Sequence, residues 1–366
     1  MKDIKKLTVK YNGTTVGYLA YVGNKLAFQY DDSWITNGFS ISPLSLPLSN
    51  KIYYSKDNIF HGLFGVFHDS LPDGWGEVLV RRVLLNKKIE YDNLNALQRL
   101  MLINKDGLGA LTYEPNESYD NKKINFDIDK LAELAANIYD DHATTKNLDT
   151  IYRIGGSSAG ARPKAHLKIN KDYYIVKFLC RGDSKDVGLQ EYKANMLAKQ
   201  CGININECTI FDSKLCKGYF AAKRFDRDKN GKRIHMISLS SLLETTHRIP
   251  NLDYYHLFQV IKAFCKDKED LYEAYRRMCF NVLYNNIDDH GRNFAFLYDE
   301  KNKTYKLSPA FDITKSDKKA EHEMTVCGKG RPTENDLLKI AVEMRLTLEK
   351  CQQIISKVKE VIKNAG

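Results

Sequence analysis

The sequence predicts an α+β fold in which a small β-rich N-terminal subdomain precedes a mainly helical C-terminal lobe. Short apolar runs separated by tight turns fill about the first sixty residues, whereas apolar positions recur at helical spacing towards the C-terminus. Strand-like and helical patterns mix between these two parts. At a soft prior of roughly 150 residues per domain, the 366 residues can form two compact units.

The composition is that of a basic globular protein. The chain has 56 Lys and Arg against 46 Asp and Glu, for a net charge of +10, and 43% of its residues are hydrophobic. This balance excludes a mainly disordered chain. The basic residues occur in scattered pairs such as Arg81-Arg82, Arg276-Arg277 and Lys318-Lys319. Such pairs indicate a solvated surface, and the alternative is a weak, salt-sensitive affinity for nucleic acid or another polyanion.

Targeting and redox signals favour a cytoplasmic protein. No apolar run approaches the roughly 18 residues of a membrane span, and the basic first residues precede no apolar signal-peptide region. The eight cysteines form no Cys-x-x-Cys pair and are scattered through periodic apolar segments. We therefore expect reduced core thiols rather than disulfides or a zinc site.

The N-terminal part reads as a β meander followed by helices. Three apolar runs, 7–9, 16–22 and 26–30, are joined by Asn12-Gly13 and Gly23-Asn24 turns. A helical period follows over 60–84, interrupted by Pro72-Asp73-Gly74, and further helices are expected at about 92–105 and 127–140. The polar stretch 114–123 is the best candidate boundary. The predicted domains are 1–115, 116–230 with the nucleotide-binding features, and 231–366.

Elements of the remaining chain alternate in type. Strands are expected at 165–169, 173–178 and 219–222, and a hairpin at 294–298 and 304–307. Helices are expected at 188–202, 240–246, 253–264 and 271–286, and two more follow at the C-terminus, where Thr333 offers an N-cap.

A Gly-rich segment precedes the strand at 165–169. It runs between a polar loop and that strand and reads Gly155-Gly156-Ser157-Ser158-Ala159-Gly160-Ala161-Arg162-Pro163-Lys164. Small residues let backbone N–H groups approach phosphate oxygens, and hydroxyls add donors. It is not a P-loop, because the lysine is misplaced and a strand follows. Ser157, Ser158, Ala159, Gly160 and Ala161 are the candidate phosphate contacts; a flexible surface loop is the alternative.

A lysine and a glutamate follow the Gly-rich segment in a suggestive order. Lys177 lies in an otherwise apolar strand, where a charge needs a partner or a polyanionic ligand. Glu191 lies fourteen residues further on, on the next predicted helix. Protein kinases use a strand lysine for nucleotide phosphates and a helix glutamate to hold that lysine. The alternative is a lysine at a sheet edge and a solvated glutamate.

The strongest signal lies between the last long helix and the hairpin, in Asp288-Asp289-His290-Gly291-Arg292-Asn293. An aspartate five residues before an asparagine matches a kinase catalytic loop, in which Asp288 receives the substrate proton and Asn293 binds Mg²⁺. Asp312 follows the hairpin and returns a second carboxylate for the metal. His290 either supports the loop or is a buried structural residue. Each loop alone could be an Asx-rich turn.

Several motifs together resemble the HipA toxin kinases. They occur in two parts of the chain and in the same order as in that family: Ile41-Ser42-Pro43-Leu44, Phe64-Gly65-Val66-Phe67-His68-Asp69-Ser70-Leu71-Pro72-Asp73-Gly74-Trp75-Gly76, Ser157 to Ala165, Arg224-Phe225-Asp226-Arg227, Asp288-x-His290-x-x-Asn293-Phe294 and Ser308-Pro309-Ala310-Phe311-Asp312. The resemblance covers nearly the whole chain. The family often has Gln-Glu-Lys where this chain has Arg162-Pro163-Lys164.

The resemblance implies a two-lobed, kinase-like fold with Mg²⁺ and ATP in a central cleft. It implies a serine/threonine protein kinase that is the toxin of a toxin–antitoxin pair and phosphorylates a translation component such as an aminoacyl-tRNA synthetase. It further implies a HipB-type DNA-binding antitoxin, through which alone the protein would meet operator DNA, and self-phosphorylation at Ser157. Arg224 and Phe225 would line the interlobe hinge, although Phe225 is favoured slightly as a core residue.

Two other functions fit parts of the pattern. A small-molecule kinase of the aminoglycoside or choline type shares the Asp-x4-Asn and later Asp arrangement, but the N-terminal motifs argue against it. A non-catalytic, DNA-associated co-repressor is the other alternative. The presence together of Lys177, Asp288, Asn293 and Asp312 argues against a kinase that has lost its activity.

Overall fold

The computed structural model describes residues 4–56, 58–103, 107–117, 127–139, 145–316 and 319–365. The chain forms two compact, interleaved units. Unit 1 comprises residues 1–189, 209–237 and 241–244, and unit 2 comprises 190–208, 238–240 and 245–366. The predicted boundary at 114–123 lies partly outside the described residues. No helix in the described ranges is long and apolar enough to cross a membrane.

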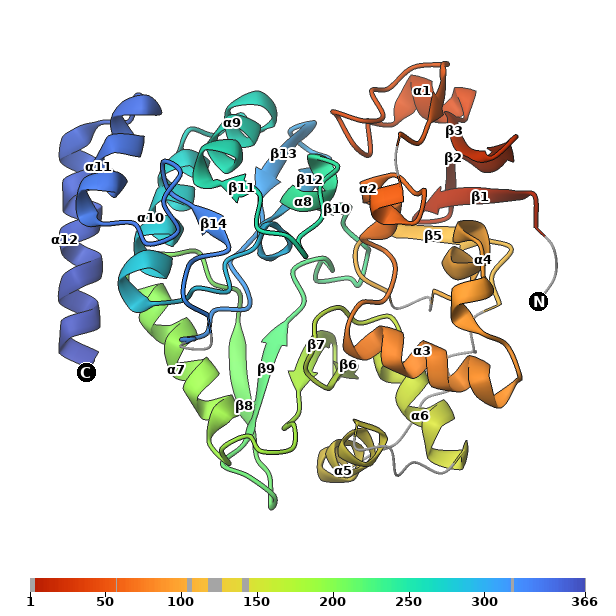
Figure 1. The fold of residues 1–366 in the computed structure, drawn as a ribbon, viewed down its shortest axis with the longest axis horizontal. Helices are drawn as coiled ribbons and strands as arrows, with labels where there is room; N and C mark the ends of the chain where they lie inside the picture. The colour runs from red at the N-terminus through yellow and green to blue at the C-terminus, as the bar shows by residue number, and fades with distance from the viewer. Residues whose placement is uncertain are drawn as a thin grey trace. The chain divides into compact units, whose positions relative to one another are not determined.

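Unit 1 begins with the expected β meander. Its five-stranded antiparallel sheet has the order β4-β3-β2-β1-β5, formed by β1 Lys6–Tyr11, β2 Thr14–Val22, β3 Lys25–Tyr30, β4 Ile52–Tyr54 and β5 Leu111–Glu114. Figure 1 labels β1, β2, β3 and β5 of this sheet. Asn12 and Gly13 both have positive φ, as a tight hairpin turn requires. Alternate residues of β1 are buried, because successive side chains of a strand point to opposite faces.

The helices of unit 1 follow the predicted periodicity with shorter bounds. They are α1 Asp32–Asn37, α2 Gly65–His68, α3 Trp75–Asn86, α4 Ala96–Met101, α5 Ile128–Tyr139 and α6 Thr145–Gly155. The predicted helix at 60–84 is interrupted before α3, where Gly74 has a φ of 54°. The prediction of a polar loop ahead of the Gly-rich segment is wrong, because α6 leads directly into it. The first sixty residues, expected to form strands, also contain helix α1, whose N-terminus is capped by the Asp31 side chain.

A second sheet carries the lysine and hinge motifs. Its order is β6-β7-β9-β8, formed by β6 Lys164–Ile169, β7 Asp172–Lys177, β8 Cys208–Phe211 and β9 Tyr219–Lys223. Trp75 and Leu79 of α3 and Ile151 of α6 pack with Val176 and Tyr219 of this sheet in one hydrophobic core. The Gly-rich segment therefore starts from a helix that the core holds in place.

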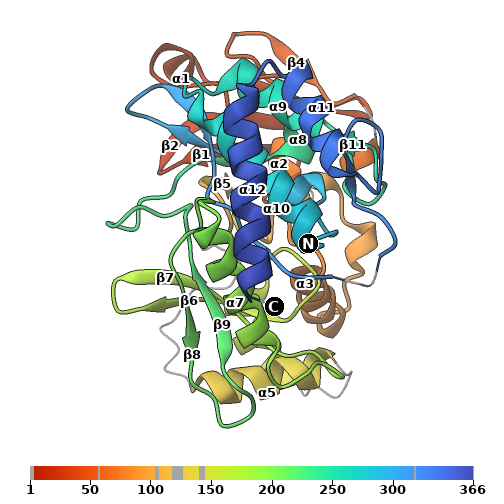
Figure 2. The same cartoon turned by 90° about the vertical axis from the view of Figure 1, so that its left-hand side faces the viewer.

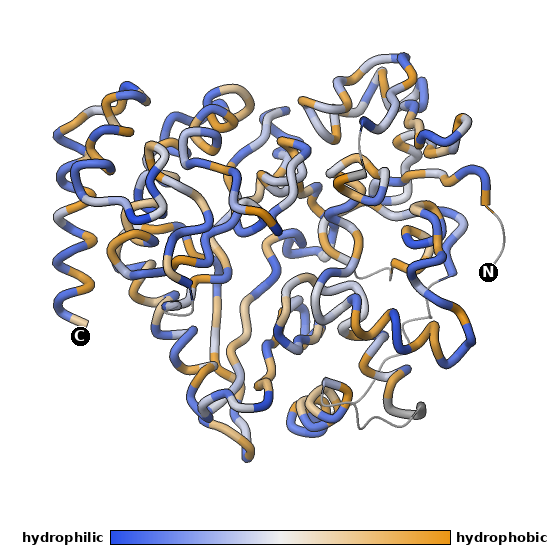
Figure 3. The backbone as a smooth tube through the Cα atoms, in the orientation of Figure 1, coloured by the Kyte–Doolittle hydropathy of each residue, from blue (hydrophilic) through white to orange (hydrophobic). Residues whose placement is uncertain are grey.

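Unit 2 is mainly helical. It contains most of α7 Val187–Gln200, with α9 Tyr254–Phe264, α10 Glu269–Tyr284, α11 Glu334–Glu343 and α12 Leu348–Ala365. Helix α12 runs along α10 and α11 (Figure 2) and buries Cys351, Ile354, Ile355 and Val358. Hydrophobic and hydrophilic residues alternate along α12 (Figure 3), as expected of a helix with one buried face.

The short elements of unit 2 flank the candidate catalytic motifs. Strands β12 Ala295–Asp299 and β13 Thr304–Leu307 form the predicted hairpin, and β11 Leu252–Asp253 pairs in parallel with β14 Met324–Thr325. The chain passes between the units at β10 Met236–Ser238 and α8 Leu239–Leu242. The predicted helix at 240–246 is wrong beyond Leu242, because Glu244 has a positive φ.

Candidate active site

The loop after α10 holds Asp288 and Asn293 in a fixed relation. Helix α10 ends at Asn285 in the left-handed conformation, and a 3-10 turn spans Gly291–Asn293. The Asn293 Nδ2 donates a 2.8 Å hydrogen bond to the backbone carbonyl of Asp288. The five-residue spacing therefore corresponds to a loop closed by this hydrogen bond. The bond holds the side-chain nitrogen of Asn293, and the side-chain oxygen takes no part in it.

The two adjacent aspartates of this loop have different environments. The Asp289 side chain is fully buried; its carboxylate accepts hydrogen bonds from the Tyr254 hydroxyl (2.7 Å) and the Glu323 backbone amide (3.0 Å), and His322 Nδ1 lies 2.9 Å from it. The Asp288 side chain is 42% exposed. Asp289 therefore holds the loop, and Asp288 is the carboxylate that a substrate can reach.

Arg277 corrects a prediction made from charge alone. As half of a basic pair it was expected on a solvated surface, but it is buried and its Nη2 donates a 2.6 Å hydrogen bond to the Ser308 carbonyl. Its Nε bonds to Glu273, which in turn accepts from the backbone amide of Asn204. Arg277 thus anchors the Ser308-Pro309-Ala310 segment that leads to Asp312.

Asp312 is held in an uncommon backbone conformation. Its φ is +58°, in the left-handed region that aspartate tolerates better than most residues. The Ala310 backbone amide donates to the carbonyl of Asn204 at 2.8 Å. Asn195 Nδ2 of α7 donates to the Ile313 carbonyl at 3.4 Å. Bonds on both sides of Asp312 therefore maintain a conformation that the residue would otherwise seldom adopt.

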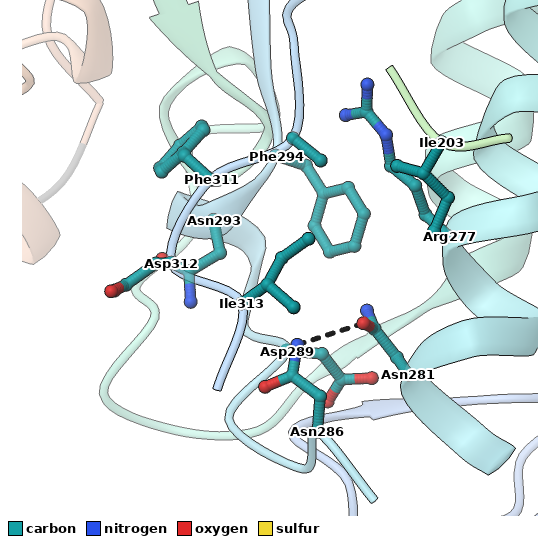
Figure 4. Close-up of a pocket in the computed structure, with 11 residues that line it drawn as sticks. Ile203, Arg277, Asn281, Asn286, Asp289, Asn293, Phe294, Phe311, Asp312 and Ile313 are labelled. Atoms are coloured by element: carbon teal, nitrogen blue, oxygen red, sulfur yellow. Dashed lines mark hydrogen bonds between the residues drawn. The ribbon is translucent and has the colours of Figure 1, made fainter. Parts of the chain in front are cut away.

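Asn293 and Asp312 line one small cavity in unit 2 (Figure 4). Its volume is about 20 Å³, enough for one water molecule and far too small for a nucleotide. Figure 4 also shows Asn286 donating to Asn281. The cavity places the two predicted metal ligands, which are nineteen residues apart, on the same wall.

His290 is a mainly buried ring. Burial lowers the pKa of His290, although the nearby Asp288 and Asp312 carboxylates act in the opposite direction. Its ring centroid lies 5.2 Å from that of His247. A neutral, packed imidazole agrees with the interpretation of His290 as a supporting residue. Because its pKa is lowered, the ring adds no positive charge beside Asp288.

In unit 1 the Gly-rich segment packs against the start of α3. The Asp73 amide donates to the Ser158 carbonyl (3.2 Å), and the Trp75 amide donates to the Gly160 carbonyl (3.0 Å). These bonds satisfy amides at the start of α3, which has no side-chain cap. The α3 start therefore fixes the backbone of the candidate phosphate-binding loop.

The two loop serines are both buried. Ser158 donates its hydroxyl to the Gly155 carbonyl at 2.6 Å and is fully buried, while Ser157 is 5% exposed. Arg162 forms a two-pronged ion pair with Asp183 at the end of the segment. Phosphorylation of either serine would require this segment to leave its present position.

Lys177 is the last residue of β7 and is half-buried. Its register partner on β6 is Lys164, so two lysines oppose each other across the strand pair. The Lys164 ammonium donates to the Ala159 carbonyl of the Gly-rich segment at 2.5 Å. Like charges directly opposite each other across strands are destabilising, so the two ammonium groups favour anionic partners. Sequence reasoning did not select Lys164, and only the strand register reveals it.

Glu191 is buried on α7, in unit 2. Its backbone carbonyl accepts a 2.8 Å hydrogen bond from Asn195, the residue that also contacts Ile313. A role for Glu191 in orienting Lys177, which belongs to unit 1, stays a prediction.

The Arg224-Phe225-Asp226 motif follows β9 and carries a buried ionic cluster. Asp226 accepts hydrogen bonds from Arg224 (2.7 and 2.8 Å), Arg227 (3.0 Å) and the Gly109 amide (2.7 Å). Both arginines also donate to the Gly107 carbonyl. Phe225 is half-buried, so the slightly favoured interpretation as a core residue is wrong.

The donor set around Asp312 suits magnesium bound together with a nucleotide. Within the described ranges, no three His, Cys, Asp or Glu side chains gather as a metal site. Mg²⁺ commonly uses one or two carboxylates with substrate phosphates rather than an all-protein cage. One aspartate, Asp312, and one amide, Asn293, on one cavity wall match that pattern.

Comparison with known proteins identifies the family. Residues 7–114 match the family model of the HipA N-terminal domain, and residues 156–365 match that of the HipA-like C-terminal domain. The chain therefore belongs to the HipA family. The fold agrees with that of HipA in the Shewanella oneidensis HipA, HipB and operator DNA complex, with a TM-score of 0.73, 18% identity, and coverage of 98% of this chain and 89% of the other.

A Haemophilus influenzae protein named "Putative kinase" is 32% identical over 180 residues. The alignment covers 43% of this chain and 52% of that protein, so the chain spans about half the length of this relative. The predicted HipA resemblance is confirmed by the family matches, and the predicted α+β fold by the structural match.

Proposed function

We propose that the chain is a Mg-ATP-dependent serine/threonine protein kinase. The observation that carries the proposal is the geometry of unit 2. There a hydrogen bond closes the loop from Asp288 to Asn293, Asp312 has a positive φ, and Asn293 and Asp312 line the same cavity. Phosphoryl transfer needs little covalent chemistry from the protein and depends on positioning and charge stabilisation.

Each residue then has a distinct task. Asp288 orients the attacking hydroxyl and accepts its proton. Asn293 and Asp312 hold Mg²⁺, which neutralises charge on the nucleotide phosphates. The Gly-rich segment and Lys177 hold phosphates, and Arg224 and Phe225 belong to the hinge motif. The bonds that fix Asp312 and Asn293 keep these donors in place before a nucleotide arrives.

Substitution of the two carboxylates tests this activity. We expect Asp288→Ala and Asp312→Ala to lower ATP-dependent phosphorylation at least about 100-fold, since each removes a charge at the reacting phosphoryl group. Glu360→Ala, an exposed position on α12, is the control. Full phosphoryl transfer in either variant would refute the assignment. Transfer to aminoglycosides or choline, with none to protein, would favour the small-molecule kinase.

We further propose that the protein is the toxin of a type II toxin–antitoxin pair. The support is its family and the HipA–HipB–operator complex of its structural neighbour. The partner would be a HipB-type antitoxin, and the target a translation component such as an aminoacyl-tRNA synthetase. Overexpression should arrest growth and translation, and the co-expressed antitoxin should relieve the arrest. Unchanged growth in the producing host would contradict the toxin role.

Self-phosphorylation would switch this kinase off. Ser157 is the proposed acceptor, as the resemblance to the family implies, and the hydroxyl of the adjacent Ser158 donates to the Gly155 carbonyl. A phosphate adds roughly two negative charges and would compete with nucleotide phosphates for Lys177 and the loop amides. Peptide mapping after incubation with Mg-ATP should find phosphate on Ser157 and reduced ATP affinity. Phosphate found only elsewhere would exclude this switch without affecting the kinase assignment.

A further inference from the structure

A lysine outside the recognised motifs contacts the proposed catalytic base. Lys319 lies in the segment after Asp312, and its ammonium donates to Asp288 Oδ1 at 2.5 Å and to Glu323 Oε1 at 2.6 Å. All three residues belong to unit 2. The ammonium is therefore shared by two carboxylates, one of which is the group assigned to accept the substrate proton.

The residues that follow Lys319 are bonded to the loop that carries Asp288. The Glu323 side chain is only 13% exposed, and its backbone amide donates to the Ile287 carbonyl (3.2 Å) and to Asp289 (3.0 Å). His322 also contacts Asp289. The segment that carries Lys319 is thus bonded to the catalytic loop at several points, and it cannot move away without breaking those bonds.

Stability does not account for this ion pair. The Lys319 and Asp288 side chains are 40% and 42% exposed. Exposed pairs of this kind contribute about 0–1 kcal/mol, because both charges remain hydrated and the long side chain loses freedom. A functional reason for the contact is therefore worth testing.

We propose that Lys319 is a further catalytic residue, whose ammonium binds the phosphoryl group as it is transferred. The inference rests on the proposed kinase function. The hydroxyl oxygen that gives its proton to Asp288 is the atom that attacks phosphorus, so the phosphoryl group must come within one oxygen atom of Asp288. An ammonium in contact with Asp288 then lies beside the equatorial phosphoryl oxygens, where the transition-state charge is spread.

The step is balanced without any further reactant. The bond from the hydroxyl oxygen to phosphorus forms as the bond from phosphorus to the ADP oxygen breaks, the hydroxyl proton passes to Asp288, and Lys319 keeps its own proton. Burial lowers the pKa of Lys319, but the hydrogen bonds to Asp288 and Glu323 outweigh this and raise it, which keeps the charge in place. Burial lowers the pKa of His290, so the neighbouring ring does not replace that charge.

Four variants separate this role from a structural one. Lys319→Gln removes the charge, Lys319→Arg keeps it, and Glu323→Gln breaks the second ion pair while leaving the ammonium. Lys315→Gln, an exposed position in the same segment, is the matched control. One readout is the single-turnover rate of ADP formation from Mg-ATP. The other is calorimetric affinity for Mg-ADP alone and for Mg-ADP with aluminium fluoride, which mimics the transferred phosphoryl group.

We expect Lys319→Gln to lower the rate about 100-fold and to abolish the extra affinity gained with aluminium fluoride, because both depend on the transferring charge. Affinity for Mg-ADP alone should stay within about threefold of the wild type. Lys319→Arg should recover part of both losses, Glu323→Gln should lose less than Lys319→Gln, and Lys315→Gln should match the wild type.

Three results would overturn the inference while leaving the proposed kinase intact. Lys319→Gln could match the wild type in both readouts. It could turn over faster, which would make the ion pair a block on Asp288. Lys319→Gln could also lose no more rate and affinity than Glu323→Gln, with no recovery in Lys319→Arg. Lys319 would then have only a structural role in holding its segment to the loop. A wild-type chain that neither turns over ATP nor binds Mg-ADP would overturn the kinase function and this inference together.

Discussion

Single buried charges position loops in both units. Asp226 in unit 1 joins two arginines to the segment Gly107–Gly109, and Arg277 in unit 2 joins α10 to the Ser308 carbonyl. Burial alone would raise the pKa of the Asp226 carboxyl, but the Arg224 and Arg227 guanidinium groups outweigh it and hold the pKa well below its usual range. Asp226 is therefore ionised, and its removal takes a buried carboxylate away from two buried guanidinium groups.

We predict that Asp226→Ala destabilises the protein by about 3–5 kcal/mol, the range seen when one partner of a buried ion pair is removed. Denaturant unfolding of the wild type and variant measures the change. Asp212→Ala, at an exposed position, is the control and should stay within about 0.5 kcal/mol. Equal unfolding midpoints for all three proteins would show that the cluster adds nothing to stability.

His235 makes stability depend on pH. The ring is fully buried, Nε2 lies 2.8 Å from the Ile41 carbonyl, and burial lowers the pKa to about 4, with the hydrogen bond to Ile41 acting in the opposite direction. In the unfolded chain the pKa is about 6.5. Between these values the unfolded state binds more protons, so the stabilising contribution is present above pH 6.5 and is lost as pH falls towards 4.

We expect the wild type to lose about 3 kcal/mol more than His235→Gln between pH 7 and pH 4, since each pKa unit corresponds to about 1.4 kcal/mol. Glutamine can still donate to the Ile41 carbonyl but does not titrate in this range. Urea unfolding at a series of pH values gives both curves. Parallel curves would contradict a buried neutral His235.

The sequence predicts which residue types carry the chemistry but not which neighbours hold them. Asp288 and Asn293 were recognisable because a five-residue spacing is local. The burial of Asp289 depends on Tyr254 and His322, which lie more than thirty positions away in the sequence. Nothing in the sequence distinguishes Arg277 from a surface arginine, because its contact with the Ser308 carbonyl is also long-range. Lys319 had no sequence signal beyond its charge.

At the scale of elements, the start of α3 and the Gly-rich segment act as one structure. A Cβ atom added at Gly74 would lie 2.6 Å from the Gly160 carbonyl oxygen, closer than real contacts allow. The backbone of Gly74 also has a positive φ, a conformation that residues other than glycine seldom adopt. Any substitution there must displace the candidate phosphate-binding loop.

We predict that Gly74→Ala increases hydrogen–deuterium exchange in residues 155–162 and weakens Mg-ADP binding. Gly62→Ala separates strain from contact, because Gly62 also has a positive φ but has open space around it. That variant should lose stability without altering exchange in the Gly-rich segment. The same exchange in both variants would show that α3 does not hold the loop.

Long amphipathic elements could be predicted, and short or cap-determined ones could not. Helices α9 and α10 lie within two residues of their predicted bounds because their apolar stripes are strong. Helix α6 is not predicted, because its sequence is mainly polar. The predicted helix at 240–246 is longer than α8, because the positive φ of Glu244 leaves no mark in a periodicity pattern.

At the scale of the whole chain, buried ion pairs change the net charge of +10 very little. Arg224, Arg227 and Arg277 are buried together with Asp226 and Glu273, so three basic groups and two acidic groups are withdrawn from the surface. Long-range attraction to polyanions persists, but it carries no information on base sequence.

We predict that the protein alone binds two unrelated DNA duplexes with equal, weak affinity, and that this affinity falls at least about tenfold between low and physiological salt. Fluorescence anisotropy measures both effects. Preference for an operator should require the proposed antitoxin. A strong preference for one duplex by the protein alone would contradict indirect contact with DNA.

The interleaving of the two units sets an order of events during synthesis. A nascent chain that has reached residue 208 contains β6 and β7 but lacks β9, the strand that pairs with β7. Unit 1 is completed only with residues 241–244, after unit 2 has received its first two segments. Neither unit is one continuous stretch, so a protease or an early stop cannot release an intact half. An enzyme proposed to harm its own cell would lack the complete sheet that carries Lys177 until β9 has been synthesised.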